Sequence, residues 1–178
     1  MPVYRSFLET FPTPQALAQA SVQDIERVIY PLGLRWRAPL LKRLGERLAE
    51  LNGRLPETLK ELTGLPGVGP YAASAWLSFH GSRRSVIVDA NVVRWLCRLV
   101  GMPYDGETRR EKWLLQLADR FTPRHNWKAY NYAALDFARE VCAPRPRCEM
   151  CPIGPKLCAY GRARLSGSAG LHFTDQNG

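Results

Sequence analysis

The sequence predicts an all-α protein, and three observations lead to that prediction. Apolar residues recur at helical spacing along most of the 178 residues. Capping residues or prolines stand where these stretches begin, and glycines stand where several of them end. The brief run Ser85–Val88 is the only candidate for a strand. We therefore expect short helices joined by turns, without an internal repeat.

Helices in the first half are marked by their start and stop signals. Thr13-Pro14 combines an N-cap with a proline at the first helical position. Ser21 and Asp24 resemble a capping box, which opens a second helix that runs to about residue 30. Beyond Gly33, leucines recur at helical spacing and a shorter helix comes after them. The leucine helix runs from Ala38 to Gly53, and the shorter one follows Pro56.

Four further helices are expected in the second half. Small residues fill the first, from Ala72 to His80, and Asp89 stands at the N-cap position of the next. Thr108 and Glu111 form a capping box, which predicts a helix running to about residue 121. The last long helix, at about 127–141, leads into a group of cysteines. We predict a disordered tail at 165–178.

The chain is strongly basic. Its 25 Lys and Arg residues against 16 Asp and Glu residues give a net charge of +9, which suggests a polyanionic partner. The N-terminus shows no signal-peptide pattern, and no apolar run approaches the roughly 20 residues of a membrane span. We expect a cytoplasmic protein, in a reducing compartment where grouped cysteines indicate a metal site rather than disulfides.

The segment Leu65-Pro-Gly-Val-Gly69 is the first with functional information. Gly67 and Gly69 can adopt backbone angles closed to other residues, and Pro70 suits the first position of a helix. Such a turn directs free backbone N–H groups outward at the positive end of a helix, where they bind a phosphate. We therefore expect Gly67, Val68 and Gly69 to contact DNA. An ordinary helix–helix turn is the alternative.

A second motif stands at a matched distance. Eighteen residues after Tyr71, Asp89 lies in Val-Asp-Ala-Asn-Val-Val-Arg. Together the two motifs resemble the helix-hairpin-helix (HhH-GPD) DNA glycosylases of base-excision repair, in the group of endonuclease III and adenine glycosylase. They are most similar to the mismatch thymine glycosylases. The resemblance runs from about residue 3 to residue 160.

The resemblance implies a two-lobed, all-α helix-hairpin-helix glycosylase fold. A helical barrel lobe would span 1–101, with the hairpin motif at about 57–81. A lobe with an iron–sulfur cluster would span 102–164. The family has further residues before the point where this sequence begins, so we expect the fold to be N-terminally truncated here.

The chemistry of such enzymes gives two residues a catalytic role. Cleavage of an N-glycosidic bond builds positive charge on the sugar, and a nearby carboxylate stabilises that charge and activates water. The resemblance assigns this role to Asp89, with a plain helix N-cap as the alternative. Relatives with a lyase step carry lysine where this chain has Tyr71, because an amine forms the Schiff base. We therefore predict a monofunctional enzyme in which Tyr71 contacts the flipped nucleotide. Helix packing is the alternative for Tyr71.

The cysteines Cys142, Cys148, Cys151 and Cys158 lie within 17 residues, which is a strong metal-binding pattern. Zinc and a [4Fe–4S] cluster both suit four thiolates at this spacing. The resemblance implies the [4Fe–4S] cluster as a scaffold, with a redox role as the alternative. The longer outer gap follows the central pair here, whereas in the family it precedes that pair. Cys97 is assigned to the core.

The resemblance predicts two further DNA contacts. Arg145 and Arg147 stand in a loop that contacts phosphates in relatives. Leu34, Arg35 and Trp36 occupy a loop that in relatives inserts a side chain into the base stack, and helix packing is the alternative. Two polar residues of the last long helix are expected to be structural: Asn131 and Asp136.

The sequence thus predicts a monomeric, monofunctional DNA glycosylase that acts on a mispaired or damaged base in duplex DNA. Thymine or uracil opposite guanine is the leading substrate. One alternative is an adenine glycosylase acting at A·G or A·8-oxoguanine pairs, against which Tyr71 argues. The other is a catalytically silent iron–sulfur module that only binds DNA.

Overall fold

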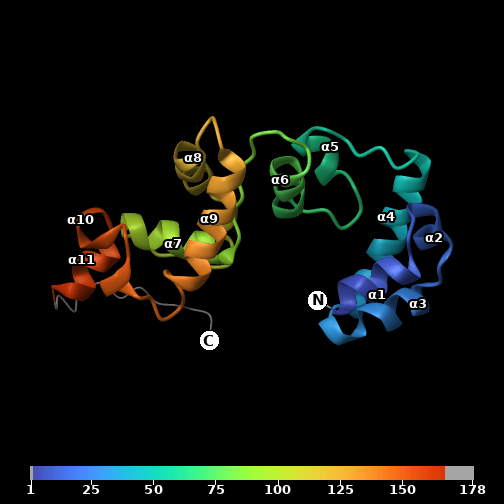
Figure 1. Cartoon of the computed structure of the whole chain (residues 1–178), viewed down its shortest axis with the longest axis horizontal. Coiled ribbons are helices and arrows are strands. Elements are labelled where there is room, and N and C mark those ends of the chain that lie inside the picture. The colour runs from blue at the N-terminus through green and yellow to red at the C-terminus, as the bar shows by residue number, and fades with distance from the viewer. Residues whose placement is uncertain (1, 167–178) are drawn as a thin grey trace. The chain divides into compact units, whose positions relative to one another are not determined.

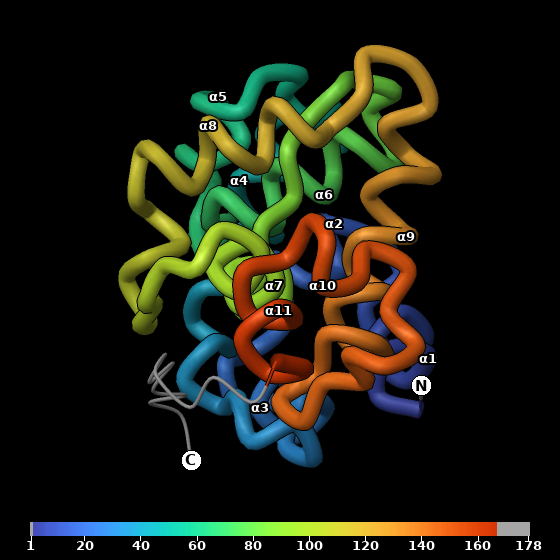
Figure 2. Tube along the Cα trace, turned by 90° about the vertical axis from the view of Figure 1, so that its left-hand side faces the viewer, coloured from blue at the N-terminus to red at the C-terminus, as the bar shows by residue number. Residues whose placement is uncertain are grey.

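Helices and turns make up the computed structural model, which describes residues 2–166 (Figures 1 and 2). No strand occurs in this range, so the all-α prediction is confirmed. The chain divides into two compact units, residues 1–73 and 74–178, and the division falls within one helix. The lobe boundary at residue 101 stays a prediction. From residue 167 on, the predicted disordered tail lies outside the described residues.

The first unit contains short helices joined by 3-10 turns. They are α1 (Pro2–Thr10), α2 (Pro14–Gln19), α3 (Val22–Ile29), η1 (Tyr30–Leu32), η2 (Arg35–Arg37), α4 (Ala38–Glu50), α5 (Leu59–Thr63) and the start of α6 (Pro70–Phe79). Capping hydrogen bonds confirm two predicted starts. The side chain of Thr13 accepts from the N–H three residues on at 3.1 Å, and Ser21 accepts from the N–H of Asp24 at 3.1 Å. The short helix predicted after Pro56 is also confirmed: α5 begins at Leu59, and the side chain of Thr58 caps it by accepting from the N–H of Glu61.

Close packing of α2 and α4 forms the centre of the first unit. A Cβ atom added to Gly45 would lie 2.9 Å from Cγ of Leu17 and 3.0 Å from the nitrogen of Ala18, so glycine is required at this contact. Lys42 donates from Nζ to the carbonyl groups of Ala18 (2.6 Å) and Ala20 (3.0 Å), which satisfies the end of α2. The buried core here consists of Phe11, Leu17, Ile25, Ile29 and Ala38.

Helix α7 (Ala90–Val100) is the central helix of the second unit. All its residues from Val92 to Arg98 are buried. It packs against α8 (Lys112–Phe121) and α9 (Trp127–Glu140), and in both overall views α11 (Ala159–Leu165) also lies beside it (Figures 1 and 2). Helix α10 (Gly154–Leu157) contacts α11. The predicted helices at 90 and at 127–141 are therefore confirmed.

The predicted capping box at Thr108 is wrong. Residues Thr108–Arg110 form a 3-10 turn, η3, and α8 begins only at Lys112. The reason is Asp105, whose Oδ1 accepts from the N–H and from the hydroxyl of Thr108, at 2.9 Å each. These hydrogen bonds stabilise the ionised carboxylate and so hold the pKa of Asp105 below its usual range, and the bond from the Thr108 hydroxyl contributes most. A competing cap three residues upstream thus occupies the threonine.

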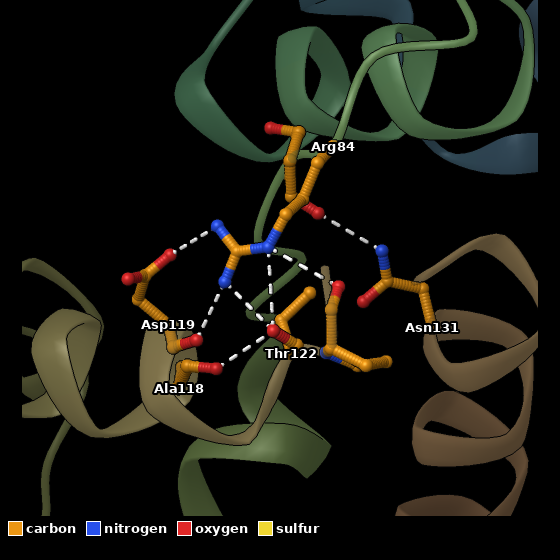
Figure 3. Close-up of polar contacts among 7 residues, drawn as sticks. Arg84, Ala118, Asp119, Thr122 and Asn131 are labelled. Carbon is orange, nitrogen blue, oxygen red and sulfur yellow. Dashed lines mark hydrogen bonds and ion pairs between the residues drawn. The ribbon is translucent and has the colours of Figure 1, made fainter. Parts of the chain in front are cut away.

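Two polar side chains fix the segment that leads to α7 (Figure 3). The guanidinium of Arg84 pairs with Asp119 (2.7 Å) and donates to the carbonyl groups of Asp119 and Thr122 (2.7 Å each) at the end of α8. The buried Asn131 donates from Nδ2 to Oγ of Ser78 (2.8 Å) and to the carbonyl of Ser85 (2.9 Å). The structural role predicted for Asn131 is confirmed.

Asp136 is exposed whereas Asn131 is buried, although both residues lie on α9. Its carboxylate is exposed on the surface and pairs with Arg139 at 3.2 Å, one turn along the helix. Such an exposed pair contributes little to stability. Among the described residues, no helix is long and apolar enough to cross a membrane.

Candidate functional site

Asp89 lies at the N-terminus of α7, where its two carboxylate oxygens have different partners. Oδ1 accepts from the backbone N–H of Val92 at 2.7 Å, which confirms the predicted N-cap. Oδ2 accepts from Nδ2 of Asn91 at 3.0 Å. The residue is half-buried. The carboxylate is therefore held in one orientation while part of the residue stays accessible to solvent.

Behind Asp89, a chain of polar contacts runs along one face of α7. Oδ1 of Asn91 accepts from Nη2 of Arg94 at 3.0 Å. Arg94 is only 8% exposed, and it also donates to the carbonyl groups of Ala138 (2.8 Å) and Cys142 (3.0 Å). The carboxylate of Asp89 is thereby linked through side chains to the backbone at the first cysteine.

The sequence analysis assigned no role to Asn91, Arg94 or Arg98. The sequence does contain a signal for buried arginines, because two arginines four residues apart interrupt an otherwise apolar stretch of α7. Arginine is almost never fully buried unless it is paired. Two arginines on the core side of a helix therefore indicate that a neighbouring segment supplies acceptors for them.

The hairpin lies in the first unit. The N–H of Val68 donates to the carbonyl of Leu65 at 3.1 Å, and the carbonyl of Gly69 accepts from the N–H of Ala73 at 3.0 Å as α6 begins. Gly67 has φ +72°, and an added Cβ would lie 3.2 Å from Cβ of Leu40, so glycine is favoured here on both grounds. Gly69 does not adopt a positive φ.

Tyr71 stands in the first turn of α6 and is 47% exposed. Gly67 and Gly69 are also exposed, and Val68 is half-buried. The start of α6 thus presents its backbone and one aromatic ring at the surface of the first unit. The positive end of the helix dipole lies here, which suits a phosphate.

The loop predicted to enter the base stack contains the short 3-10 turn η2. Trp36 is 63% exposed, and the guanidinium of Arg37 lies 4.9 Å from its ring centroid. Arg35 is exposed, and its guanidinium lies 5.3 Å from the ring of Tyr30. Leu34 is half-buried. Exposed rings next to guanidinium groups can stack on nucleobases.

All four cysteines of the predicted metal site line one cavity of the second unit. The cavity has a volume of about 20 Å³ and is partly open to solvent. The 3-10 turn η4 (Cys148–Met150) and α10 carry the loop around it. Trp95 and Arg98 of α7 also line this cavity. The structure therefore brings together four side chains that are up to 16 positions apart in the sequence.

Donors already point at two of these sulfur atoms. The N–H of Gly161 donates to Sγ of Cys158 at 3.4 Å, and Nη1 of Arg98 donates to Sγ of Cys142 at 3.8 Å. Arg98 also donates to the carbonyl groups of Ala143 (2.7 Å) and Pro144 (3.1 Å). Burial raises the pKa of the Cys142 thiol, and the guanidinium of Arg98 opposes that shift.

The remaining cysteine, Cys97, is separate from this group. It is fully buried within the core of α7, α8 and α9, as predicted. Burial raises the pKa of its thiol to about 11. The thiol therefore stays protonated at neutral pH and is a poor metal ligand or nucleophile.

The spacing of the four thiols allows two kinds of metal centre. Within residues 2–166, no three His, Cys, Asp or Glu side chains are placed to hold one metal ion. Four thiolates around a single zinc ion would lie about 3.8 Å apart, given a Zn–S bond of about 2.3 Å. A cubane holds its thiolates farther apart, around a volume of its own. Four cysteines lining one cavity can supply the thiolates that a [4Fe–4S] cluster requires.

Comparison with known protein families identifies the family of this chain. Residues 1–119, which include the hairpin and Asp89, match the family described as HhH-GPD superfamily base excision DNA repair protein. The chain belongs to this superfamily. The predicted helix-hairpin-helix fold is thereby confirmed.

Other HhH-GPD proteins match over most of the chain. A thymine/uracil-DNA glycosylase of Pyrobaculum aerophilum is 39% identical over 170 residues, which cover 91% of this chain and 73% of that protein. A solved structure of a thermostable thymine-DNA glycosylase has a TM-score of 0.82 at 31% identity, covering 90% and 75%. A non-covalent endonuclease III–DNA complex has a TM-score of 0.80 at 27% identity, covering 93% and 77%.

These HhH-GPD relatives match well beyond residue 119, so the likeness extends through the cysteine loop. Exposed cations stand on the cysteine loop there. Arg145 and Arg147 are exposed, as are Arg162 and Arg164 on α11. The only acidic residue in this stretch from 143 to 164 is Glu149. The loop therefore presents a surface suited to a polyanion.

Proposed function

We propose that this protein is a base-excision repair glycosylase that releases thymine or uracil paired with guanine in duplex DNA. The observation that carries the proposal is the carboxylate of Asp89, fixed through both oxygens at the start of α7 in a chain of the HhH-GPD superfamily. The similarity to thymine/uracil-DNA glycosylases supports the substrate class.

The chemistry is hydrolysis at the C1′ atom of the flipped nucleotide. The bond from C1′ to the base breaks, the base leaves with the bonding electrons, and C1′ gains positive charge. The carboxylate of Asp89 stabilises this charge and accepts a proton from the attacking water. The products are the free base and an abasic sugar with a new hydroxyl group at C1′. Because Asn91 holds Oδ2, the carboxylate needs no reorientation before it acts.

The start of α6 binds the DNA backbone. The backbone of Gly67, Val68 and Gly69, at the positive end of α6, binds a phosphate next to the flipped nucleotide. Leu34, Arg35 or Trp36 fills the gap that the flipped base leaves. Among these three residues, Trp36 is the exposed aromatic one and so offers the largest stacking surface.

No strand cleavage accompanies base release. A lyase step needs an amine that forms a Schiff base with the opened sugar. Tyr71 stands where relatives with that step carry lysine, and its phenol cannot form an imine. The enzyme therefore leaves the abasic site intact.

Cys142, Cys148, Cys151 and Cys158 hold a [4Fe–4S] cluster. When bound, the cluster cross-links the loop from 142 to 158 and so orders its backbone. Arg94 and Arg98 fasten the start of this loop to α7 through backbone carbonyl groups. Arg145 and Arg147 then contact DNA phosphates from an ordered loop.

A panel of mismatched duplexes tests the proposal. Labelled duplexes with T·G, U·G, A·G, A·8-oxoguanine or normal pairs are incubated with enzyme, then treated with alkali to cut at abasic sites. We expect cuts at T·G and U·G only, and none before alkali. Cutting at A·G pairs would instead identify an adenine glycosylase. Absence of base release from every duplex, with DNA binding retained, would identify a silent binding module.

Asp89→Asn separates catalysis from folding in the same assay. The amide oxygen can still accept from the N–H of Val92, so we expect the helix cap and DNA binding to persist. Base release should fall below detection. Asp105→Asn is the matched control, because it makes the same change at another helix-turn carboxylate of the second unit. Base release by Asp89→Asn at the wild-type rate would refute the role of Asp89.

A further inference from the structure

Trp95 buries a hydrogen-bond donor that has no acceptor in the described part of the chain. The residue is 9% exposed, and its Nε1 atom is buried without a hydrogen-bond partner among residues 2–166. Its ring packs edge-on against Phe137, with centroids 5.2 Å apart. Buried indole N–H groups are normally paired, because desolvation without a partner is unfavourable. An acceptor from outside residues 2–166 is therefore expected.

The position of Trp95 indicates where this acceptor lies. The residue lines the same cavity as Cys142, Cys148, Cys151 and Cys158. It precedes Arg98 by three positions, so the two side chains share one face of α7. Arg98 already donates to Sγ of Cys142 from that face.

The residues that line the cavity indicate which chemical group the acceptor is. Its wall is formed largely by apolar side chains such as Phe137 and Ile153, together with the four sulfur atoms. An iron–sulfur cluster ligated by four thiolates carries negative charge on its sulfur atoms, and N–H donors to those atoms stabilise it. Within residues 2–166, Gly161 donates to Cys158 and Arg98 donates to Cys142.

We propose that the indole N–H of Trp95 donates a hydrogen bond to a sulfur atom of the bound [4Fe–4S] cluster and raises its reduction potential. The inference rests on the cofactor assigned under the proposed function. A hydrogen bond to sulfur withdraws negative charge, and it does so most effectively for the reduced, more negative cluster. Trp95 is thus a tuning residue of the cluster and takes no part in base release.

The chain offers a matched control. Trp127 also has a buried Nε1 without a partner among the described residues. It stands at the start of α9 and does not line the cysteine cavity. Trp95→Phe and Trp127→Phe therefore make the same chemical change, with only the first of them beside the cluster.

The experiment measures the midpoint potential of the holoprotein by voltammetry. The iron content and brown absorbance of wild type and both variants are determined first. We expect full iron loading in all three, a lower midpoint potential for Trp95→Phe, and the wild-type potential for Trp127→Phe. Equal potentials in wild type and Trp95→Phe would overturn the proposal. Wild-type protein that binds no iron would overturn the cofactor assignment, and this inference with it.

A second measurement can be decided on wild-type protein alone. Pulsed EPR of the paramagnetic cluster in wild-type protein with ¹⁵N-labelled indole should show a weak nitrogen coupling and an exchangeable proton. Both signals should vanish in Trp95→Phe, if that variant folds, and persist in Trp127→Phe. Absence of an indole nitrogen coupling in loaded wild-type protein would overturn the proposal even if Trp95→Phe failed to fold.

Discussion

At the scale of single residues, the second oxygen of Asp89 distinguishes a catalytic carboxylate from a plain cap. Capping requires one oxygen, and Oδ1 serves that purpose through the N–H of Val92. Oδ2 is held by Asn91, which is itself held by Arg94. A side chain whose supporting partners are in turn supported keeps its orientation. The sequence predicted the position of Asp89 but not this support.

Asn91→Ala should impair base release more than DNA binding. Without Nδ2, the carboxylate of Asp89 can rotate about its cap, and a misplaced catalytic group loses rate. We expect single-turnover base release from T·G duplexes to slow by about tenfold, equivalent to about 1.4 kcal/mol of activation free energy. Affinity for the same duplex, measured by fluorescence anisotropy, should change by less than about twofold.

Asn91→Asp serves as a companion variant. It keeps an oxygen for Arg94 but places a second carboxylate beside Asp89, so it also removes the donor to Oδ2. We expect it to be at least as slow as Asn91→Ala. Wild-type base release by both variants would mean that the contact between Asn91 and Asp89 does not position the carboxylate.

Tyr71→Lys should add a lyase step. An amine at this exposed position can condense with the aldehyde of the opened abasic sugar, which releases water and forms an imine. We expect strand cleavage without alkali and a covalent protein–DNA adduct on borohydride reduction. Wild type and Tyr71→Phe serve as controls that yield neither. Absence of an adduct with Tyr71→Lys, despite retained base release, would place this side chain away from the sugar.

At the scale of elements, local signals predicted most helix starts but not every competing cap. Thr13, Ser21 and Asp89 cap helices as their sequence context indicates. Thr108 does not, because Asp105 engages both its N–H and its hydroxyl. Two capping residues within three positions compete for the same groups, and sequence spacing alone does not choose between them.

Arg84 fastens the segment before α7 to the end of α8 (Figure 3). Arg84→Ala removes several charge-assisted hydrogen bonds, so we expect the second unit to lose about 2–3 kcal/mol of unfolding free energy. Asp119→Ala removes only the exposed ion pair and should cost less than about 1 kcal/mol. Urea unfolding followed by circular dichroism measures both. Equal losses would show that the carboxylate, rather than the carbonyl groups, dominates the contact.

At the scale of the whole molecule, contacts between distant segments were the part that sequence could not predict. The sequence spacing of the four cysteines predicted that they share one metal site, and the distance between two motifs identified the hairpin and Asp89. Neither showed that Arg94 and Arg98 reach 44 or more positions along the chain to the carbonyl groups that begin the cysteine loop. Such partners are chosen by tertiary packing, and a charged residue in a helix is usually exposed.

The cysteine loop should contribute a measurable share of the electrostatic binding of DNA. If Arg145 and Arg147 each neutralise one phosphate, the double alanine variant should flatten the slope of log K against log salt by about 1.8. The control double variant, Arg47→Ala with Arg110→Ala, loses the same charge. Those arginines, however, already pair with Glu50 and Glu107.

Anisotropy titrations of a T·G duplex over a range of salt concentrations measure both slopes. Because counterion release counts only phosphates that are contacted, a general loss of positive charge cannot mimic the effect of the loop variant. The control slope should stay near that of wild type, and iron content should stay unchanged in both variants. Equal flattening in the two variants would mean that net charge, and not the loop, sets the affinity.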